Sequence, residues 1–149
     1  MGVFMIFNRK TMLLTATLLS SQVFAASIDL YKSKSCGCCT AWAEIMEKNG
    51  HEVKVHEEKD WSNVRQSHGL PYQLGSCHTA IIDGYLIEGH VPQAEIDKLL
   101  TEKPTDIAGL SAPGMPMHSP GMAKEGAPFK DFQVVAFDKA GNMSLYRQY

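Results

Sequence analysis

The alternation of apolar and polar residues predicts a strand, a helix and a second strand in the first part of the chain. Residues 28–31 and residues 52–57 both alternate, as the strands of a half-buried sheet do. Between them, Trp42, Ile45 and Met46 form an apolar stripe with the spacing of a helix. A strand–helix–strand unit this short predicts parallel strands joined by a right-handed crossover.

The middle of the chain predicts a short helix, a β-hairpin and a longer helix. Residues 60–66 are expected to be helical, and two apolar runs, 79–82 and 85–87, flank an Asp-Gly turn. A further helix is expected from Pro92 to just before Pro104. The resulting order, β-α-β-α-β-β-α, is that of a single thioredoxin-like domain of the α/β class.

The last part of the chain predicts a specialised loop and a closing hairpin. Segment 109–126 combines dense proline and glycine with three methionines, so we expect neither helix nor strand there. Two apolar runs around a Gly-Asn turn predict a C-terminal hairpin over residues 132–146.

The first 25 residues have the pattern of a secretory signal peptide. Arg9 and Lys10 precede a short apolar run, and the segment ends in Val-Phe-Ala at Ala25. The run is shorter than the ~20 residues of a membrane-spanning helix, so we expect no permanent membrane anchor. The mature domain, residues 26–149, is therefore expected outside the cytoplasm and, in a bacterium, in the periplasm.

The charge balance argues against one class of partner. The chain has 14 basic and 16 acidic residues, and two of the basic residues lie in the predicted signal peptide. A mildly acidic domain without a basic stripe is a poor nucleic-acid binder. We therefore expect no nucleic-acid partner.

Three of the four cysteines lie together where the first strand is followed by the first helix. Cys36 and Cys39 have the spacing of disulfide oxidoreductases, in which a helix N-terminus lowers the pKa of a thiol. Cys38 adds a thiol to the same turn, and this thiol would compete with any resolving step. Three thiolates at the positive end of a helix suit a soft metal such as Cu(I), and thiolates alone also suit zinc.

Further candidate ligands are expected at the same edge of the sheet. A third strand antiparallel to the first would begin beside the end of the first, which places Cys77 and His78 next to the three cysteines. His90 follows the fourth strand at this edge, either as a ligand or as a group supporting one. The loop could fold over the edge and offer further thioether and imidazole ligands, namely Met115, Met117, His118 and Met122.

The residues leave three alternatives open for the cysteine cluster: a metal site, a redox disulfide between Cys36 and Cys39, and an inert structural element. Among metals, the methionines favour copper, because thioether is a poor zinc ligand. Cys38 argues against a thiol-disulfide oxidoreductase, which needs only two of the three thiols.

Three separated motifs together resemble the CopG-type family of periplasmic metal-binding proteins, which are associated with bacterial copper resistance and long catalogued as a domain of unknown function. The motifs are Tyr-Lys-Ser-Lys-Ser-Cys-Gly-Cys-Cys at 31–39, Ser-Cys-His-Thr-Ala to Glu-Gly-His-Val-Pro at 76–92, and Pro-Gly-Met-Pro-Met-His-Ser-Pro-Gly-Met at 113–122. The resemblance covers nearly all of residues 28–146.

The resemblance implies a thioredoxin-like domain with a role in copper redox handling. By this likeness Cys36, Cys38 and Cys39 bind copper, and Cys77 and His78 are candidate ligands. Ordinary thioredoxins have a proline directly before the third strand, where this chain has Cys77-His78. That departure argues against general disulfide exchange.

We therefore expect a periplasmic copper-binding protein for copper resistance. It would bind Cu(I), as one ion or as a multinuclear copper–thiolate cluster, and exchange copper with other periplasmic copper-handling proteins. Cycling between Cu(I) and Cu(II) would make it a copper oxidoreductase rather than a passive buffer, and the sequence leaves both open. The alternative is a periplasmic thiol-disulfide oxidoreductase that uses Cys36 and Cys39.

Overall fold

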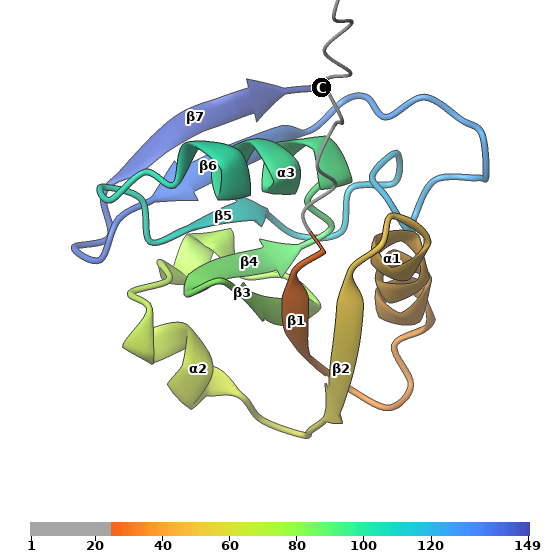
Figure 1. Cartoon of the computed structure of the whole chain (residues 1–149), viewed down its shortest axis with the longest axis horizontal. Coiled ribbons are helices and arrows are strands. Elements are labelled where there is room, and N and C mark those ends of the chain that lie inside the picture. Colours follow the sequence, from red (N-terminus) through yellow and green to blue (C-terminus); the bar gives the residue numbers. More distant parts are fainter. Residues whose placement is uncertain (1–24) are drawn as a thin grey trace, which may run out of the picture.

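The computed structural model describes residues 25–149 (Figure 1). The predicted signal peptide lies, except for its last residue, outside the described residues. Seven strands form one mixed sheet in the order β2-β1-β3-β4-β5-β6-β7, and three α-helices accompany it, so the predicted α/β class is confirmed. Within residues 25–149, no helix has the length and apolar character needed to span a membrane.

All three α-helices lie in the first two thirds of the described chain, among the first five strands. The strands are β1 (Ser27–Lys32), β2 (Glu52–Glu57), β3 (His78–Ile82), β4 (Tyr85–Gly89), β5 (Gly109–Ala112), β6 (Gln133–Phe137) and β7 (Met143–Gln148). The helices are α1 (Gly37–Lys48), α2 (Ser62–Ser67) and α3 (Gln93–Glu102), with a 3-10 turn, η1 (Tyr72–Leu74), before β3. The predicted elements from the first strand to the third helix are all present in the predicted order.

The pairing of β1 with its two neighbours determines where the candidate ligands lie. β1 pairs with β2 in parallel and with β3 antiparallel, as the sequence predicts. Lys32, the last residue of β1, is the register partner of His78, the first residue of β3. The chain leaves β1 directly into α1, so the N-terminus of α1 and the start of β3 share one edge of the sheet.

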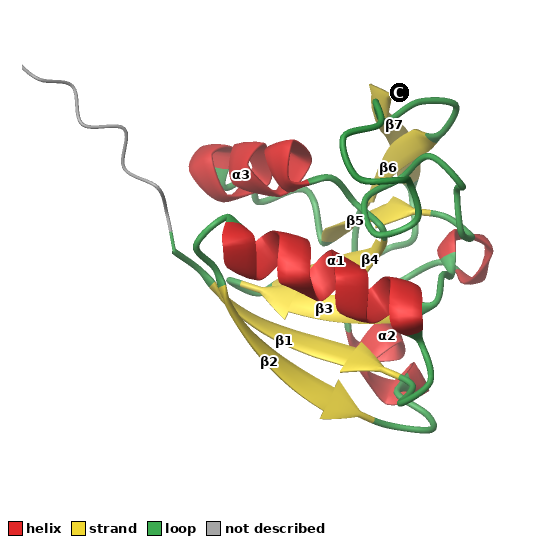
Figure 2. Ribbon diagram, turned by 90° about the vertical axis from the view of Figure 1, so that its right-hand side faces the viewer, coloured by secondary structure: helices red, strands yellow, loops and turns green. Residues whose placement is uncertain are grey.

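The two faces of the sheet are covered differently. On one face, α1 and α3 bury a large apolar cluster, and Figure 2 shows α1 lying along this face. Trp42 and Met46 of α1 are fully buried there, which confirms the apolar stripe predicted for this helix. The opposite face carries a smaller cluster around Leu74 and Leu86, at the level of the 3-10 turn. Side chains alternate between these two faces along each strand.

The prediction of a loop over 109–126 is wrong at its start. Residues 109–112 form β5, a fully buried strand between β4 and β6. A Cβ atom at Gly109 would collide with the backbone of Leu86, so this glycine permits close strand pairing instead of ending a strand. The irregular segment therefore begins at Pro113. The hairpin predicted at the C-terminus is confirmed by the antiparallel pair β6 and β7.

The segment after β5 lies against the first turn of α1 (Figure 1). Gly121 has a φ of +82°, and a Cβ there would lie 2.7 Å from the Cys38 carbonyl oxygen and 2.9 Å from the Trp42 amide nitrogen. Only glycine allows this approach of two backbones. The loop is therefore packed directly on the helix end that carries the cysteines.

Candidate metal centre

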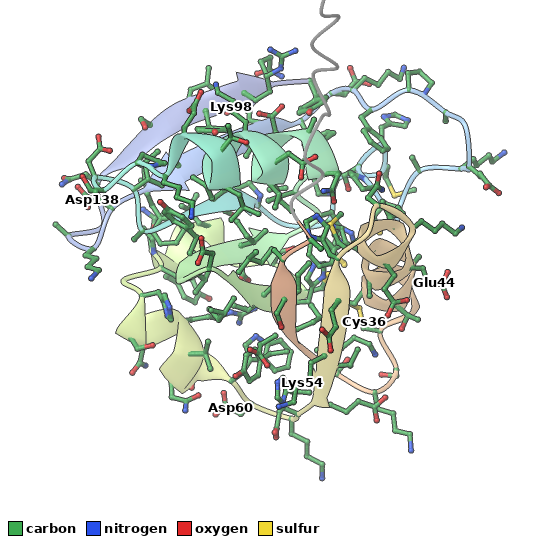
Figure 3. The ribbon with its side chains drawn as sticks, viewed as in Figure 1. Cys36, Glu44, Lys54, Asp60, Lys98 and Asp138 are labelled. Carbon is green, nitrogen blue, oxygen red and sulfur yellow. A yellow bond between two sulfur atoms is a disulfide. The ribbon has the colours of Figure 1, made fainter. Side chains whose placement is uncertain are left out.

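Four cysteine sulfur atoms meet at the N-terminus of α1. Figure 3 labels one of these residues, Cys36. Cys36 is the residue before the helix, Cys38 and Cys39 lie in its first turn, and Cys77 immediately precedes β3. All four sulfur atoms lie within 4.8 Å of one another. The Sγ–Sγ distances are 3.6 Å between Cys36 and Cys38 and 3.5 Å between Cys39 and Cys77. The expected meeting of the two cysteine motifs is confirmed.

The four cysteines are in two oxidation states in this structure. Cys36 and Cys39 form a disulfide, whereas Cys38 and Cys77 are free thiols. Cys39 is fully buried, while Cys36 and Cys38 are half-buried and Gly37 between them is exposed. The cluster therefore opens to solvent at the Cys-Gly-Cys turn and is closed at Cys39.

A second group of three ligand atoms shares the Cys77 sulfur. The Cys77 Sγ lies 3.0 Å from the His90 Nε2 and 3.6 Å from the His78 Nδ1, and the three groups lie within 4.8 Å of one another. Both imidazoles are fully buried. Cys77 therefore stands between a set of sulfur atoms and a pair of imidazoles.

The loop fixes the orientation of the His90 ring. His90 Nδ1 lies 2.8 Å from the Pro120 carbonyl oxygen, which can only accept a hydrogen bond. The proton is therefore on Nδ1, and the Nε2 lone pair faces the Cys77 thiol. An imidazole held in this way by a carbonyl is the usual arrangement of a metal-ligating histidine.

Burial keeps all three groups in their uncharged forms when no cation is present. It raises the pKa of Cys77 to about 11, with the nearby Cys38 adding to the effect. Burial also lowers the pKa of His78 to about 3, to which His90 contributes. It lowers the pKa of His90 too, against the Pro120 carbonyl. Neutral imidazoles are the form that binds metals, and a bound cation would favour the Cys77 thiolate.

His78 provides a separate sign that the site fits a metal. Among residues 25–149, its buried Nε2 has no hydrogen-bond partner. A buried polar atom left without a partner costs about 1–3 kcal/mol. Soft sulfur donors beside neutral imidazoles, one of them with an unused nitrogen, form a donor set that suits copper.

The candidate ligands of the loop are exposed or line a separate hollow. Met115 and Met117 are 58% and 68% exposed. His118 is turned to Asp131, with 3.3 Å between Nδ1 and Oδ2. His118 belongs to neither group of ligand atoms. Met117, His118 and Met122 line a hollow of about 420 Å³ whose lining includes no cysteine.

Arg65 and Glu88 form an ion pair near this site that the sequence does not predict. Glu88 is fully buried in β4, and its Oε1 lies 2.7 Å from the Arg65 Nη2. The signal available in the sequence was the Glu88 carboxylate, which follows the apolar run of a predicted strand. The pairing of two residues that are 23 positions apart is not visible in any periodicity.

The chain is similar to two solved structures over most of its length. They are titled "Copper resistance protein copG", form 1 and form 2, and each is 42% identical to this chain with a TM-score of 0.75. Each alignment covers 85% of this chain, and 99% of form 2 or 98% of form 1. A family model described as "Protein of unknown function, DUF411" matches residues 74–122, which include Cys77, His78 and His90. No curated protein sequence matches the chain.

Proposed function

The chain belongs to the CopG-type family of copper resistance proteins, and from this premise we propose that it binds Cu(I) through its cysteine cluster. The observation that carries the proposal is the meeting of four sulfur atoms within 4.8 Å. Thiolates are the protein ligands that select Cu(I). The copper ions are the cargo of this site, and copper resistance is the role it serves.

Binding through all four sulfur atoms requires reduction of the disulfide. Two electrons and two protons convert the Cys36–Cys39 disulfide into two thiols, and the thiols then release their protons to the solvent as they bind the metal. A thiol reductant is sufficient for this step. The disulfide form retains Cys38 and Cys77, so it offers Cu(I) fewer donors.

The shared position of Cys77 supports a site for more than one ion. Its thiolate could bridge an ion held by Cys36, Cys38 and Cys39 and an ion held by His78 and His90. Imidazole is a good ligand for copper in either oxidation state, whereas thiolate favours Cu(I). We include in the proposal a one-electron cycle, in which Cu(I) gives an electron to an external acceptor and Cu(II) takes one from an external donor. Such a cycle would make the protein a copper oxidoreductase.

The exposed loop supports a role in transfer. Met115, Met117, His118 and Met122 offer thioethers and an imidazole to solvent or to a hollow beside it. We propose that these residues pass copper to or from other periplasmic copper-handling proteins. In this proposal the loop residues transfer copper and do not ligate the ions held at the cysteine cluster.

We also propose that the domain has a thioredoxin-like arrangement and is located in the periplasm. The order β-α-β-α-β-β-α, with β1 and β2 parallel and β3 antiparallel to both β1 and β4, supports a thioredoxin-like arrangement. The sequence pattern before Ala26 supports cleavage after Ala25 and a periplasmic mature domain of residues 26–149.

The test is a count of metals and thiols. The protein is purified anaerobically from copper-fed cells, its metals are measured by elemental analysis, and its free thiols are titrated before and after chelation. The proposal predicts at least one copper per chain and thiols that react only after copper is removed. A metal-free protein that takes up no copper after reduction would instead favour thiol–disulfide exchange by Cys36 and Cys39.

A further inference from the structure

A buried ion pair lies on the sheet face opposite α1. Glu88 of β4 alternates with Ile87, which belongs to the cluster under α1, and so points to the other face. There its carboxylate meets Arg65 of α2, with 2.7 Å between Oε1 and Nη2. Glu88 is fully buried, and the side chain of Arg65 is 28% exposed.

The ion pair holds both polar backbone groups of Ser76. The Ser76 amide donates to the Glu88 Oε1 at 2.7 Å, and the Arg65 Nη2 donates to the Ser76 carbonyl at 2.9 Å. Ser76 precedes Cys77, and β3 begins only at His78. These side chains therefore take the place of strand partners for the Ser76 amide and carbonyl, beside an isolated parallel β-bridge between Ser76 and Gly114.

Thr79 completes the hydrogen bonding of the pair. Its hydroxyl donates to the Glu88 Oε2 and accepts from the Arg65 Nε at 3.0 Å. Every group bonded to the Glu88 carboxylate is a donor, as an ionised carboxylate requires. Both oxygens of the Glu88 carboxylate are thus hydrogen-bonded, and the fork of hydrogen bonds from Arg65 leaves little freedom to the segment it holds.

Ser76 also connects this segment to the start of the loop. Its hydroxyl donates to the Gly114 carbonyl, and the Gly114 amide donates to the Gly75 carbonyl at 3.1 Å. Any movement of Ser76 would therefore shift the Cys77 sulfur and the loop that orients His90. Within residues 25–149, neither Arg65 nor Glu88 is hydrogen-bonded to a cysteine or a histidine. Both reach the site through the residues they bond, which are Ser76 before Cys77 and Thr79 after His78, and only the Ser76 backbone is held by both.

We propose that the Arg65–Glu88 ion pair is a positioning device for the copper site, which clamps the Ser76 backbone and thereby directs the Cys77 sulfur toward Cys39 and His90. This inference rests on the proposed function for its link to copper. Its mechanical part, the control of Cys77 by Arg65 and Glu88, stands on the hydrogen bonds alone.

The first experiment measures Cu(I) affinity by competition with a coloured Cu(I) chelator. Arg65→Lys keeps the charge but loses the planar fork that reaches both Ser76 and Glu88. We expect binding to weaken by about 10–100-fold, as for other residues that orient metal ligands. Arg147→Lys is the matched control, because Arg147 is 62% exposed and lies 3.9 Å from its partner Glu95. Equal affinities of the two variants would overturn the proposal.

A double-mutant cycle separates positioning from general destabilisation. In a Cys77→Ser background, most of the effect of Arg65→Lys on Cu(I) affinity should disappear, because the effect passes through Cys77. A loss as large as in the parent protein would show that Arg65 supports the fold as a whole, and would also overturn the proposal.

A metal-free measurement tests the clamp even if the protein binds no copper. In a variant with Cys36, Cys38 and Cys39 replaced by serine, iodoacetamide reacts with the single thiol of Cys77. Arg65→Lys should raise the alkylation rate severalfold while the circular dichroism stays unchanged. Glu88→Gln keeps an oxygen for the Ser76 amide and provides a second, milder variant with the same expected direction.

The outcomes distinguish the two proposals. A parent protein that binds no Cu(I), with faster alkylation in the clamp variants, would refute the copper function and support the clamp. Copper binding by the parent with alkylation rates equal to those of Arg147→Lys would leave the copper function intact and refute the clamp.

Discussion

Cys38 distinguishes a copper–thiolate site from a pair of redox cysteines. Its sulfur lies 3.6 Å from that of Cys36, outside the disulfide between Cys36 and Cys39. We predict that Cys38→Ser weakens Cu(I) binding at least about tenfold, because a thiolate donor is lost. Competition titration measures the change, and Ser35→Ala, at an exposed position of the same turn, is the control. Unchanged affinity in Cys38→Ser would support the two-cysteine chemistry.

Cys77 contributes to the expected pH dependence of copper binding. Burial raises its pKa to about 11, so the thiol is protonated at neutral pH and releases a proton when it binds the metal. Affinity for Cu(I) should therefore fall as the pH is lowered from about 8 to about 6. His78, with a pKa of about 3, stays neutral over this range and adds nothing to the slope.

The pH prediction is checked by repeating the Cu(I) titration across this range. Replacing Cys77 by serine should reduce the slope by about one proton per copper. The same slope in both proteins would show that Cys77 does not ligate the metal.

The residues of the site differ in how far the sequence reveals them. The spacing of Cys36, Cys38 and Cys39 after a strand, together with Cys77-His78 before an antiparallel strand, was enough to predict that they lie together. The Arg65–Glu88 pair was not predictable, because it depends on which helix covers the second face of the sheet. Ligation itself stays a prediction for every residue.

At the scale of elements, periodicity predicts the amphipathic segments and fails for β5. Helices α1 and α3 each bury one apolar face, so the pattern locates them, and the Asp-Gly turn between two apolar runs locates β3 and β4. Residues 109–112 are buried on both faces and include Gly109, whose missing side chain is what the neighbouring strand requires. Composition alone therefore suggested a loop where packing produces a strand.

The loop after β5 depends on one glycine for its contact with α1. A Cβ at Gly121 would lie 2.7 Å from the Cys38 carbonyl oxygen, whereas one at Gly126 would meet nothing within 4 Å. Both glycines have positive φ, at +82° and +76°, so alanine introduces similar backbone strain at each. We predict that Gly121→Ala lowers the free energy of unfolding by about 1–3 kcal/mol more than Gly126→Ala does.

Chemical denaturation of the two variants measures this difference. Limited proteolysis should also cut the loop faster in Gly121→Ala, because the loop can no longer pack on the helix. Equal stability and equal cleavage rates would show that the contact with α1 does not hold the loop.

At the scale of the whole molecule, the fold brings together three segments that are far apart in the sequence. The turn at Cys36, the start of β3 at His78 and the loop at Pro120 meet at one edge of the sheet. Figure 3 shows Asp138, in the β6–β7 turn, at the far side of the view from Cys36. Copper bound between these segments would tie α1 to β3 and would oppose their separation on unfolding.

We therefore predict that copper stabilises the whole domain against heat. With free Cu(I) at about 100 times its Kd, Tm should rise by on the order of 10 °C. Differential scanning calorimetry of the reduced protein checks this, and a Cu(I) chelator should reverse the shift. A Tm that does not respond to copper would argue against binding at an edge formed by three segments.

Copper X-ray absorption spectroscopy on the reduced, copper-loaded protein tests most directly whether the four cysteines hold Cu(I). We predict an edge typical of Cu(I) and a first coordination shell dominated by sulfur, with nitrogen as the minor scatterer. Cys77→Ser should reduce the sulfur contribution, and Ser35→Ala should leave it unchanged. A first shell of nitrogen and oxygen alone would contradict the claim that the four cysteines hold the copper.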